Sequence, residues 1–171
     1  MSRHGALAKW LLSEPLGRNV VCVNLTDVLL EPTTPTLQFM LRPTRSNLRP
    51  TGSSSYSPLS CTSQQCTSLS PNYKCGRNKA CIYEALYWDN SASIGEFATE
   101  TVSFGSSGSV QKVAIGCGHE NQGRFGKAAG ILGLGGTAVG IPSQIQAKSF
   151  SYYLVDLDSS SSSTLEFNSA P

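Results

Sequence analysis

CIYEALYWDNSASIGEFATETVSFG, residues 81–105, predicts two β-strands joined by a tight turn. We expect the strands over residues 81–88 and 95–104, because both runs are rich in aromatic and β-branched residues. Tyr87 and Trp88 stand at the mouth of the turn. Aromatic residues there suit either ordinary packing at a strand end or a binding surface, and the hairpin alone leaves both interpretations open.

The composition favours a mainly β domain with many loops. Of the 171 residues, 39% are hydrophobic and 14% are charged, and 16 Gly and 9 Pro favour turns. This length suits one domain or one lobe of a larger protein. The net charge is +2 without a long basic or acidic run, so nothing suggests a nucleic-acid partner. No apolar stretch approaches the roughly 20 residues that span a bilayer, and no oligomer is predicted.

Downstream of the hairpin we expect further short strands. They are predicted over residues 109–118, over 150–157 as a buried strand, and over 164–168. Residues 128–136 are too rich in Gly for a stable helix, whereas residues 141–148 predict a short helix with Pro142 in its first turn.

The chain divides near residue 49. Residues 1–48 show no sustained hydrophobic period, and their Pro residues discourage both a helix and a central strand, so we expect a poorly ordered segment. Lys9 interrupts the apolar part of the first residues, which therefore make a poor signal peptide. Residues 49–171 carry the predicted strands and form the expected domain.

Six cysteines suggest a disulfide framework. Cys61, Cys66, Cys75 and Cys81 lie close together in polar sequence, as is typical of proteins made in the secretory pathway. A zinc site is the minor alternative, because spacings of four, eight and five intervening residues are not the usual ligand pairs.

Several common catalytic motifs are missing. Lys127 follows Gly126, but Ala128 stands where a phosphate-binding loop needs Ser or Thr. His4 and His119 are the only histidines, and no Gly-x-Ser-x-Gly sequence accompanies them for Ser-His-Asp catalysis. We therefore expect no cofactor and no metal.

Six stretches from about residue 49 onward follow one another in an order and at a spacing typical of one protein family: SSSYSPLSCTSQQC, YWDNSASIGEFATETVSFG, VAIGCGHENQGRF, AAGILGLGG, FSYYLVD and STLEFNSAP. On these stretches the chain resembles the N-terminal lobe of plant pepsin-like aspartic proteases, the nepenthesin and guard-cell group. Non-catalytic relatives, the xylanase inhibitors, share this N-terminal region. The implied fold is a mainly β, partial pepsin-like lobe with a stapled loop and a flap hairpin.

The resemblance implies roles for two groups of residues. The hairpin is similar to the flap that closes over substrate, with Tyr87 in the place of the flap tyrosine and Asp89 and Ser91 beside it in the substrate-binding turn. Ile131, Leu132 and Gly133 match the element that supports the catalytic loop without doing chemistry. The family usually has Gly where this chain has Trp88 and Asn90. Asn tolerates the left-handed region fairly well, whereas Trp does not.

The resemblance also implies a pairing of the cysteines. It is nested, Cys61 with Cys81 and Cys66 with Cys75. Cys117 would pair in the family with an upstream cysteine that this chain lacks, which leaves it an unpaired thiol. Cys22 is the only spare cysteine, and its surroundings do not resemble the family.

The sequence departs from the family at the catalytic residues. Aspartic proteolysis needs two Asp-Thr/Ser-Gly loops, but none of Asp27, Asp89, Asp156 and Asp158 is followed by Thr/Ser-Gly. The resemblance therefore implies an aspartic endopeptidase acting on peptides or proteins, of which this chain is an inactive piece. A non-catalytic, inhibitor-like binding protein is the alternative. The family is secreted or vacuolar, but this chain carries no visible address.

Overall fold

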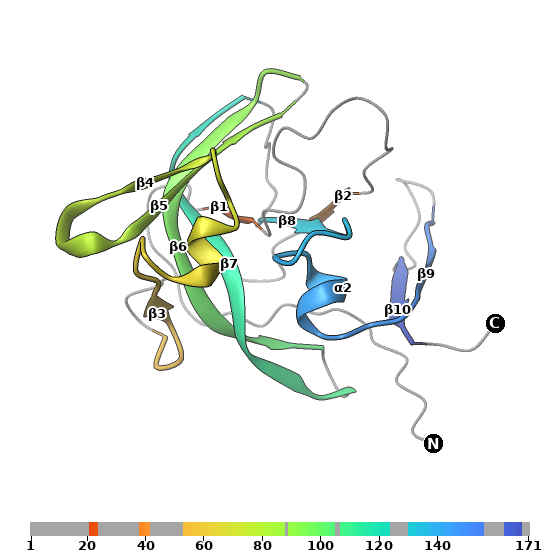
Figure 1. Cartoon of the computed structure of the whole chain (residues 1–171). Coiled ribbons are helices and arrows are strands. Elements are labelled where there is room, and N and C mark those ends of the chain that lie inside the picture. Colours follow the sequence, from red (N-terminus) through yellow and green to blue (C-terminus); the bar gives the residue numbers. More distant parts are fainter. Residues whose placement is uncertain are drawn as a thin grey trace.

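A twisted β-sheet forms most of the molecule (Figure 1). The computed structural model describes residues 53–87, 89–104, 107–123, 130–155 and 163–168, and the backbone of residues 21–23 and 38–41. Within these residues eight strands form the sheet, in the order β2-β8-β1-β7-β6-β5-β4, with β3 paired to β6. The strands of this sheet are β1 (Val21–Val23), β2 (Gln38–Leu41), β3 (Ser57–Pro58), β4 (Tyr73–Cys75), β5 (Cys81–Leu86), β6 (Ala92–Ser103), β7 (Ser109–Gln122) and β8 (Gly130–Gly133).

The antiparallel strands β5, β6 and β7 form the largest part of the sheet. The two strands predicted around the tight turn are confirmed as β5 and β6, although β6 begins earlier than expected, at Ala92. Buried and less buried residues alternate along β5, as a sheet with one covered face requires. A register shift between Glu100 and Val102 bends the β6–β7 pair. The mainly β fold predicted from the sequence is confirmed.

Two short strands come from the segment before residue 49, where the sequence predicts none. Strand β2 lies at an edge of the sheet, whereas β1 lies inside it, antiparallel to β7 and parallel to β8. A strand of three residues is too short to show a hydrophobic period, and its place depends on partners far along the chain. That is why the sequence does not reveal β1.

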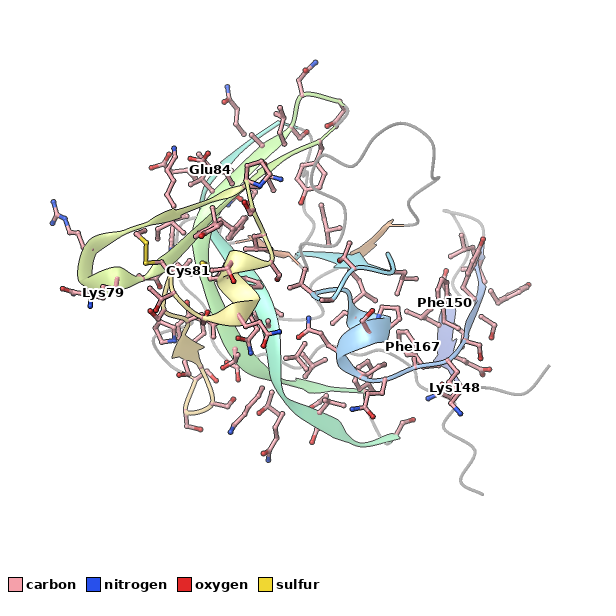
Figure 2. All side chains as sticks on the ribbon, in the orientation of Figure 1. Lys79, Cys81, Glu84, Lys148, Phe150 and Phe167 are labelled. Atoms are coloured by element: carbon pink, nitrogen blue, oxygen red, sulfur yellow. A yellow bond between two sulfur atoms is a disulfide. The ribbon has the colours of Figure 1, made fainter. Side chains whose placement is uncertain are left out.

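Strands β9 (Phe150–Tyr153) and β10 (Thr164–Phe167) form a separate two-stranded sheet. The sequence predicts the first of these as a buried strand, and that prediction is wrong, because all four residues of β9 are exposed. Among the described strands, β9 pairs only with β10, which turns Leu165 and Phe167 into the core and leaves β9 outside. Figure 2 shows Phe150 and Phe167 close together in this small sheet, and their ring centroids are 6.4 Å apart.

The helices are short. They are α1 (Gln64–Thr67), the 3-10 helix η2 (Arg77–Lys79) and α2 (Ile141–Gln144). The helix predicted over residues 141–148 is present as α2 but ends at Gln144. Gln144 joins α2 to β7: its side chain accepts a hydrogen bond from Ala114 N at 2.6 Å and donates one to Ala114 O at 3.0 Å. In the part of the chain that the structure describes, no helix is long and apolar enough to cross a membrane.

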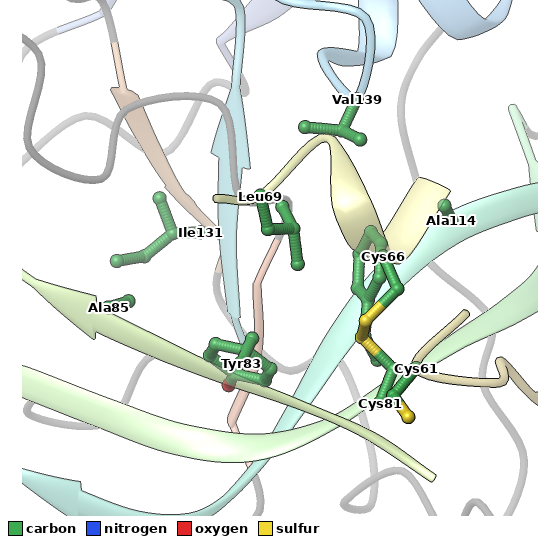
Figure 3. Close-up of a cluster of buried hydrophobic side chains, with 10 residues drawn as sticks. Cys61, Cys66, Leu69, Cys81, Tyr83, Ala85, Ala114, Ile131 and Val139 are labelled. Carbon is green, nitrogen blue, oxygen red and sulfur yellow. A yellow bond between two sulfur atoms is a disulfide. The ribbon is translucent and has the colours of Figure 1, made fainter. Parts of the chain in front are cut away.

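Among the residues that the structure describes, two hydrophobic clusters make up the core. Figure 3 shows the first, in which Tyr83, Ala85, Leu69 and Ile131 pack beside a disulfide. The second contains Leu132 and joins the main sheet to the small one, where Phe104 and Phe167 meet edge-on at 6.0 Å. Ile131 and Leu132 belong to different clusters because consecutive strand residues point to opposite faces. Strand β8 therefore holds both clusters together.

Candidate functional site

The tip of the β5–β6 hairpin forms a closed turn. Tyr87 N donates a hydrogen bond to Ser91 O at 2.8 Å, and Asn90 N donates to Tyr87 O at 3.0 Å. Asn90 has φ 62°, in the left-handed region that asparagine tolerates better than most residues. The turn thus uses asparagine where a flexible glycine would be the usual choice. Trp88, whose fit to the turn the sequence puts in doubt, lies outside the described residues.

The predicted residues Asp89 and Ser91 lie within this turn. The Asp89 carboxylate accepts a hydrogen bond from Ser91 N at 2.9 Å, which is a common way for aspartate to stabilise a turn. Ser91 is only 4% exposed. It faces Gly123 beyond the end of β7, where an added Cβ would lie 2.3 Å from Ser91 Oγ. The tip is therefore packed against the chain just after the end of β7.

Tyr87 is half-buried and packs against the first hydrophobic cluster, as Leu59 and Tyr73 do. The structure thus brings Tyr87, Asp89 and Ser91 into one turn and packs the tyrosine against buried residues. This packing suits both a strand-end aromatic and the wall of a binding site, and the role of Tyr87 stays a prediction.

The supporting run Ile131-Leu132-Gly133 lies in β8, with every residue buried. Strand β8 lies between β1 and β2, pairing parallel with the first and antiparallel with the second. A run without polar side chains, buried between two strands, can support a site but cannot do acid–base chemistry.

A buried hydrogen-bond network behind the tip was not predicted. The hydroxyls of Tyr83 and Ser93 lie 2.7 Å apart, and Ser93 Oγ donates to Asn121 Oδ1 at 2.7 Å. Asn121 Nδ2 in turn donates to Gly118 O at 3.0 Å. The network joins β5, β6 and β7, so it sets how the hairpin lies on the rest of the sheet.

Glycines in β7 make room for this network. A Cβ added at Gly116 would lie 2.6 Å from the Tyr83 ring, and one at Gly118 would lie 2.5 Å from Ser93 Oγ. The Gly-Cys-Gly run at 116–118 inside a predicted strand was the available signal, because glycine within a strand often marks a close approach.

The predicted disulfide partners are wrong. The four cysteines do form two disulfides, but Cys61 bonds Cys75 and Cys66 bonds Cys81, so the bridges cross instead of nesting. Helix α1 turns Cys66 into the first cluster, where Cys81 is also fully buried. Cys75, at the exposed end of β4, is left for Cys61, with the two Cα atoms 5.2 Å apart.

The disulfides also exclude the zinc alternative, because all four sulfurs are bonded to one another. Among the described residues, no group of three or more His, Cys, Asp or Glu side chains is placed to hold a metal ion. A shallow pocket of about 310 Å³, lined in part by Arg77, Lys79 and Glu96, lies at the end of β5 away from the turn. It contains none of the predicted site residues.

Comparisons with known proteins point in one direction. A protein-family model described as "Xylanase inhibitor N-terminal" matches residues 32–168. Aspartic proteinase nepenthesin-2 of Nepenthes gracilis is 44% identical over 122 residues, which cover 71% of this chain and 27% of the relative. Aspartyl protease family protein 2 of Arabidopsis thaliana is 41% identical over 115 residues, covering 66% of this chain and 24% of the relative.

A third similar protein is named for guard cells. The Arabidopsis thaliana protein ASPARTIC PROTEASE IN GUARD CELL 2 is 38% identical over 121 residues, covering 69% of this chain and 25% of the relative. The chain thus spans about a quarter of the length of the curated relatives it matches. No solved structure matches it.

Proposed function

Given that this chain belongs to the family of xylanase-inhibitor-type N-terminal lobes of plant pepsin-like aspartic proteases, we propose that it supplies the flap of a peptide-cleaving enzyme and is inactive alone. On this proposal residues 49–171 form part of the N-terminal lobe, and residues 1–48 are an atypical segment that adds the short strands β1 and β2 to its sheet. The substrate is a peptide or protein. The two disulfides support a secreted or vacuolar location, because such bonds persist in oxidising compartments.

The observation that carries the proposal is the closed turn at the tip of β5 and β6. In this turn Tyr87 packs against the first hydrophobic cluster and Ser91 is buried. The Asp89 carboxylate stabilises the turn by accepting a hydrogen bond from Ser91 N. An aromatic ring on a stable hairpin can line a substrate pocket and carry a hydroxyl to its edge. In this role Tyr87 contacts substrate, and Asp89 and Ser91 keep the turn in shape.

The proposed inactivity of the chain rests on the chemistry of the reaction. Two carboxylates must lie close enough to share one proton, so that one activates water while the other polarises the peptide carbonyl. None of the four aspartates stands in an Asp-Thr/Ser-Gly sequence. Asp89, the one aspartate within the described residues, has a carboxylate oxygen bonded to Ser91 N. That oxygen stabilises the turn, a role in which it does not activate water.

An acid-pH digest tests the inactivity. The purified 171-residue chain is incubated with haemoglobin or casein, next to a full-length relative as the positive control. We expect no cleavage above background, because none of the four aspartates stands in an Asp-Thr/Ser-Gly sequence. Cleavage that pepstatin blocks would contradict the proposal.

A hairpin exchange tests the flap. Residues 81–105 replace the corresponding hairpin of a full-length relative, and kcat/KM is measured with a peptide substrate. We expect the exchanged enzyme to stay active, and Tyr87→Ala within it to lower kcat/KM about tenfold or more, because a misplaced substrate reacts slowly. Leu86→Ala is the matched control, since Leu86 is next to Tyr87 but 46% exposed. Equal losses in the two variants would refute a special role for Tyr87.

A second candidate is an inhibitor-like binding protein, favoured by the description of the matching family model. On this proposal the chain binds a glycosidase and needs no catalytic aspartate. An endoxylanase assay with increasing amounts of the chain separates the candidates. Dose-dependent inhibition supports the binding protein, and unchanged xylanase activity rejects it for that enzyme.

A further inference from the structure

Strand β1 places two cysteines opposite each other. It runs antiparallel to β7, with Val21 opposite Gly118, Cys22 opposite Cys117 and Val23 opposite Gly116. The four other cysteines are bonded in pairs, so Cys22 and Cys117 are the two that these disulfides leave over. From the sequence, Cys117 is expected to be an unpaired thiol and Cys22 a spare cysteine, because the surroundings of Cys22 do not resemble the family.

The register satisfies the distance that a disulfide needs. Directly opposed residues of antiparallel strands lie on the same face of the sheet, with Cα atoms roughly 4.5–5.5 Å apart. Disulfides join Cα atoms roughly 4.4–6.8 Å apart.

The surroundings of Cys117 also favour a covalent partner inside the protein. Its side chain is fully buried in the second hydrophobic cluster, and its sulfur is a free thiol. A buried thiol is poorly accessible to bulky reagents in solvent. The residue opposite Cys117 on the adjoining strand is its nearest candidate partner, and that residue is Cys22.

We propose that Cys22 and Cys117 form a third disulfide, which closes when the chain folds under oxidising conditions. The two thiols lose two protons and two electrons, one S–S bond forms, and a disulfide oxidant such as oxidised glutathione becomes two thiols. The bond fastens a strand of only three residues to the longest strand of the sheet. It closes a loop that contains the other two disulfides and the β5–β6 hairpin, so it cross-links the N-terminal segment to the domain.

Peptide mapping tests this pairing on the complete chain. The protein is folded with oxidised and reduced glutathione, denatured, alkylated and digested with trypsin without reduction. Cleavage after Arg18 and Arg45 gives a peptide with Cys22, and cleavage after Lys112 and Arg124 gives one with Cys117. We expect these peptides to appear linked and unalkylated, in protein that runs as a monomer on a non-reducing gel.

Other products of the same experiment would overturn the proposal. These are two alkylated thiols at Cys22 and Cys117, glutathione attached to either residue, or a bond between Cys22 residues of two chains. A second measurement follows thermal unfolding of wild type and Cys22→Ser at a glutathione poise that spares the other bridges. Because the bond closes a long loop, the Tm of wild type should be on the order of 10 °C higher than the Tm of Cys22→Ser, which cannot form the bond. Equal Tm values for the two proteins would also count against the bond.

Discussion

Tyr83 shows how single residues set the packing of the main sheet. Its ring is fully buried against Gly116, and its hydroxyl reaches Ser93. The alternation along β5 places Tyr83 on the inner face of the sheet. The glycine that faces it lies on β7, a strand that does not follow β5 directly in the sequence. At this scale, space and hydrogen bonding decide which substitutions the sheet accepts.

Gly116→Ala should destabilise the protein by about 1–3 kcal/mol, because the new methyl group would lie 2.6 Å from the Tyr83 ring. Gly136→Ala is the matched control, since an added Cβ there meets nothing within 4 Å. Urea unfolding measures both. Adding Tyr83→Leu to Gly116→Ala should recover part of the loss, and equal stability of the two alanine variants would contradict this account.

Ser93→Ala should cost about 1–3 kcal/mol, because Ser93 is fully buried and bonds both Tyr83 and Asn121. Tyr83→Phe removes the other hydroxyl of the pair. Since both changes break the same hydrogen bond, the double variant should lose less than the sum of the two single losses. The free energies of unfolding of all four proteins measure this coupling, and strictly additive losses would show that the bond contributes nothing.

In the disulfide-bonded region, the secondary-structure elements determine which cysteines pair. Helix α1 and strand β4 each carry one half of a disulfide, and their orientation gives Cys66 to Cys81 and Cys75 to Cys61. Sequence spacing predicts that the four cysteines pair but leaves the partners open. The choice between crossed and nested bridges depends on where α1 directs the Cys66 side chain and where the end of β4 directs the Cys75 side chain.

Paired cysteine variants test the crossed arrangement. In Cys61→Ala/Cys75→Ala one intact bridge remains, so Cys66 and Cys81 should resist alkylation after denaturation. In Cys61→Ala/Cys81→Ala both bridges are broken, so Cys66 and Cys75 should be alkylated. Peptide mass spectrometry reads both results. The reverse outcome would restore the nested pairing that the family resemblance implies.

At the scale of the molecule, the small β9–β10 sheet leaves apolar side chains in solvent. Tyr153 is 69% exposed and Leu154 53% exposed, while Leu165 and Phe167 on the partner strand are buried. The charged residues that usually protect an exposed strand are missing from β9, whose sequence is FSYY. Exposed apolar patches of this kind promote self-association.

Tyr153→Lys/Leu154→Lys should reduce concentration-dependent association without lowering stability, because both residues are exposed and the new charges repel copies of the chain. Leu86→Lys is the control, as an exposed apolar residue at the other sheet. Sedimentation velocity over a range of concentrations measures association. If the control reduces it equally, the β9 surface is not the cause.

The sequence by itself determined the elements whose signals are local. The alternation of Cys81–Leu86, the turn residues after Tyr87 and the Pro at the start of α2 each predict their element from a few neighbouring residues. The four cysteines and the family-specific stretches likewise identify a stapled, mainly β lobe, and the family model that matches residues 32–168 confirms the family.

Only the tertiary structure decided the features that join distant parts of the chain. The crossing of the disulfides, the Tyr83–Ser93–Asn121 network, the exposure of β9 and the meeting of Cys22 with Cys117 all depend on which strands become neighbours. Strand pairing brings together residues that carry no mutual signal in sequence, because each is buried or exposed by its partner and not by its own type. Local propensity therefore predicts the long strands β5, β6 and β7, and packing decides which of their residues are buried.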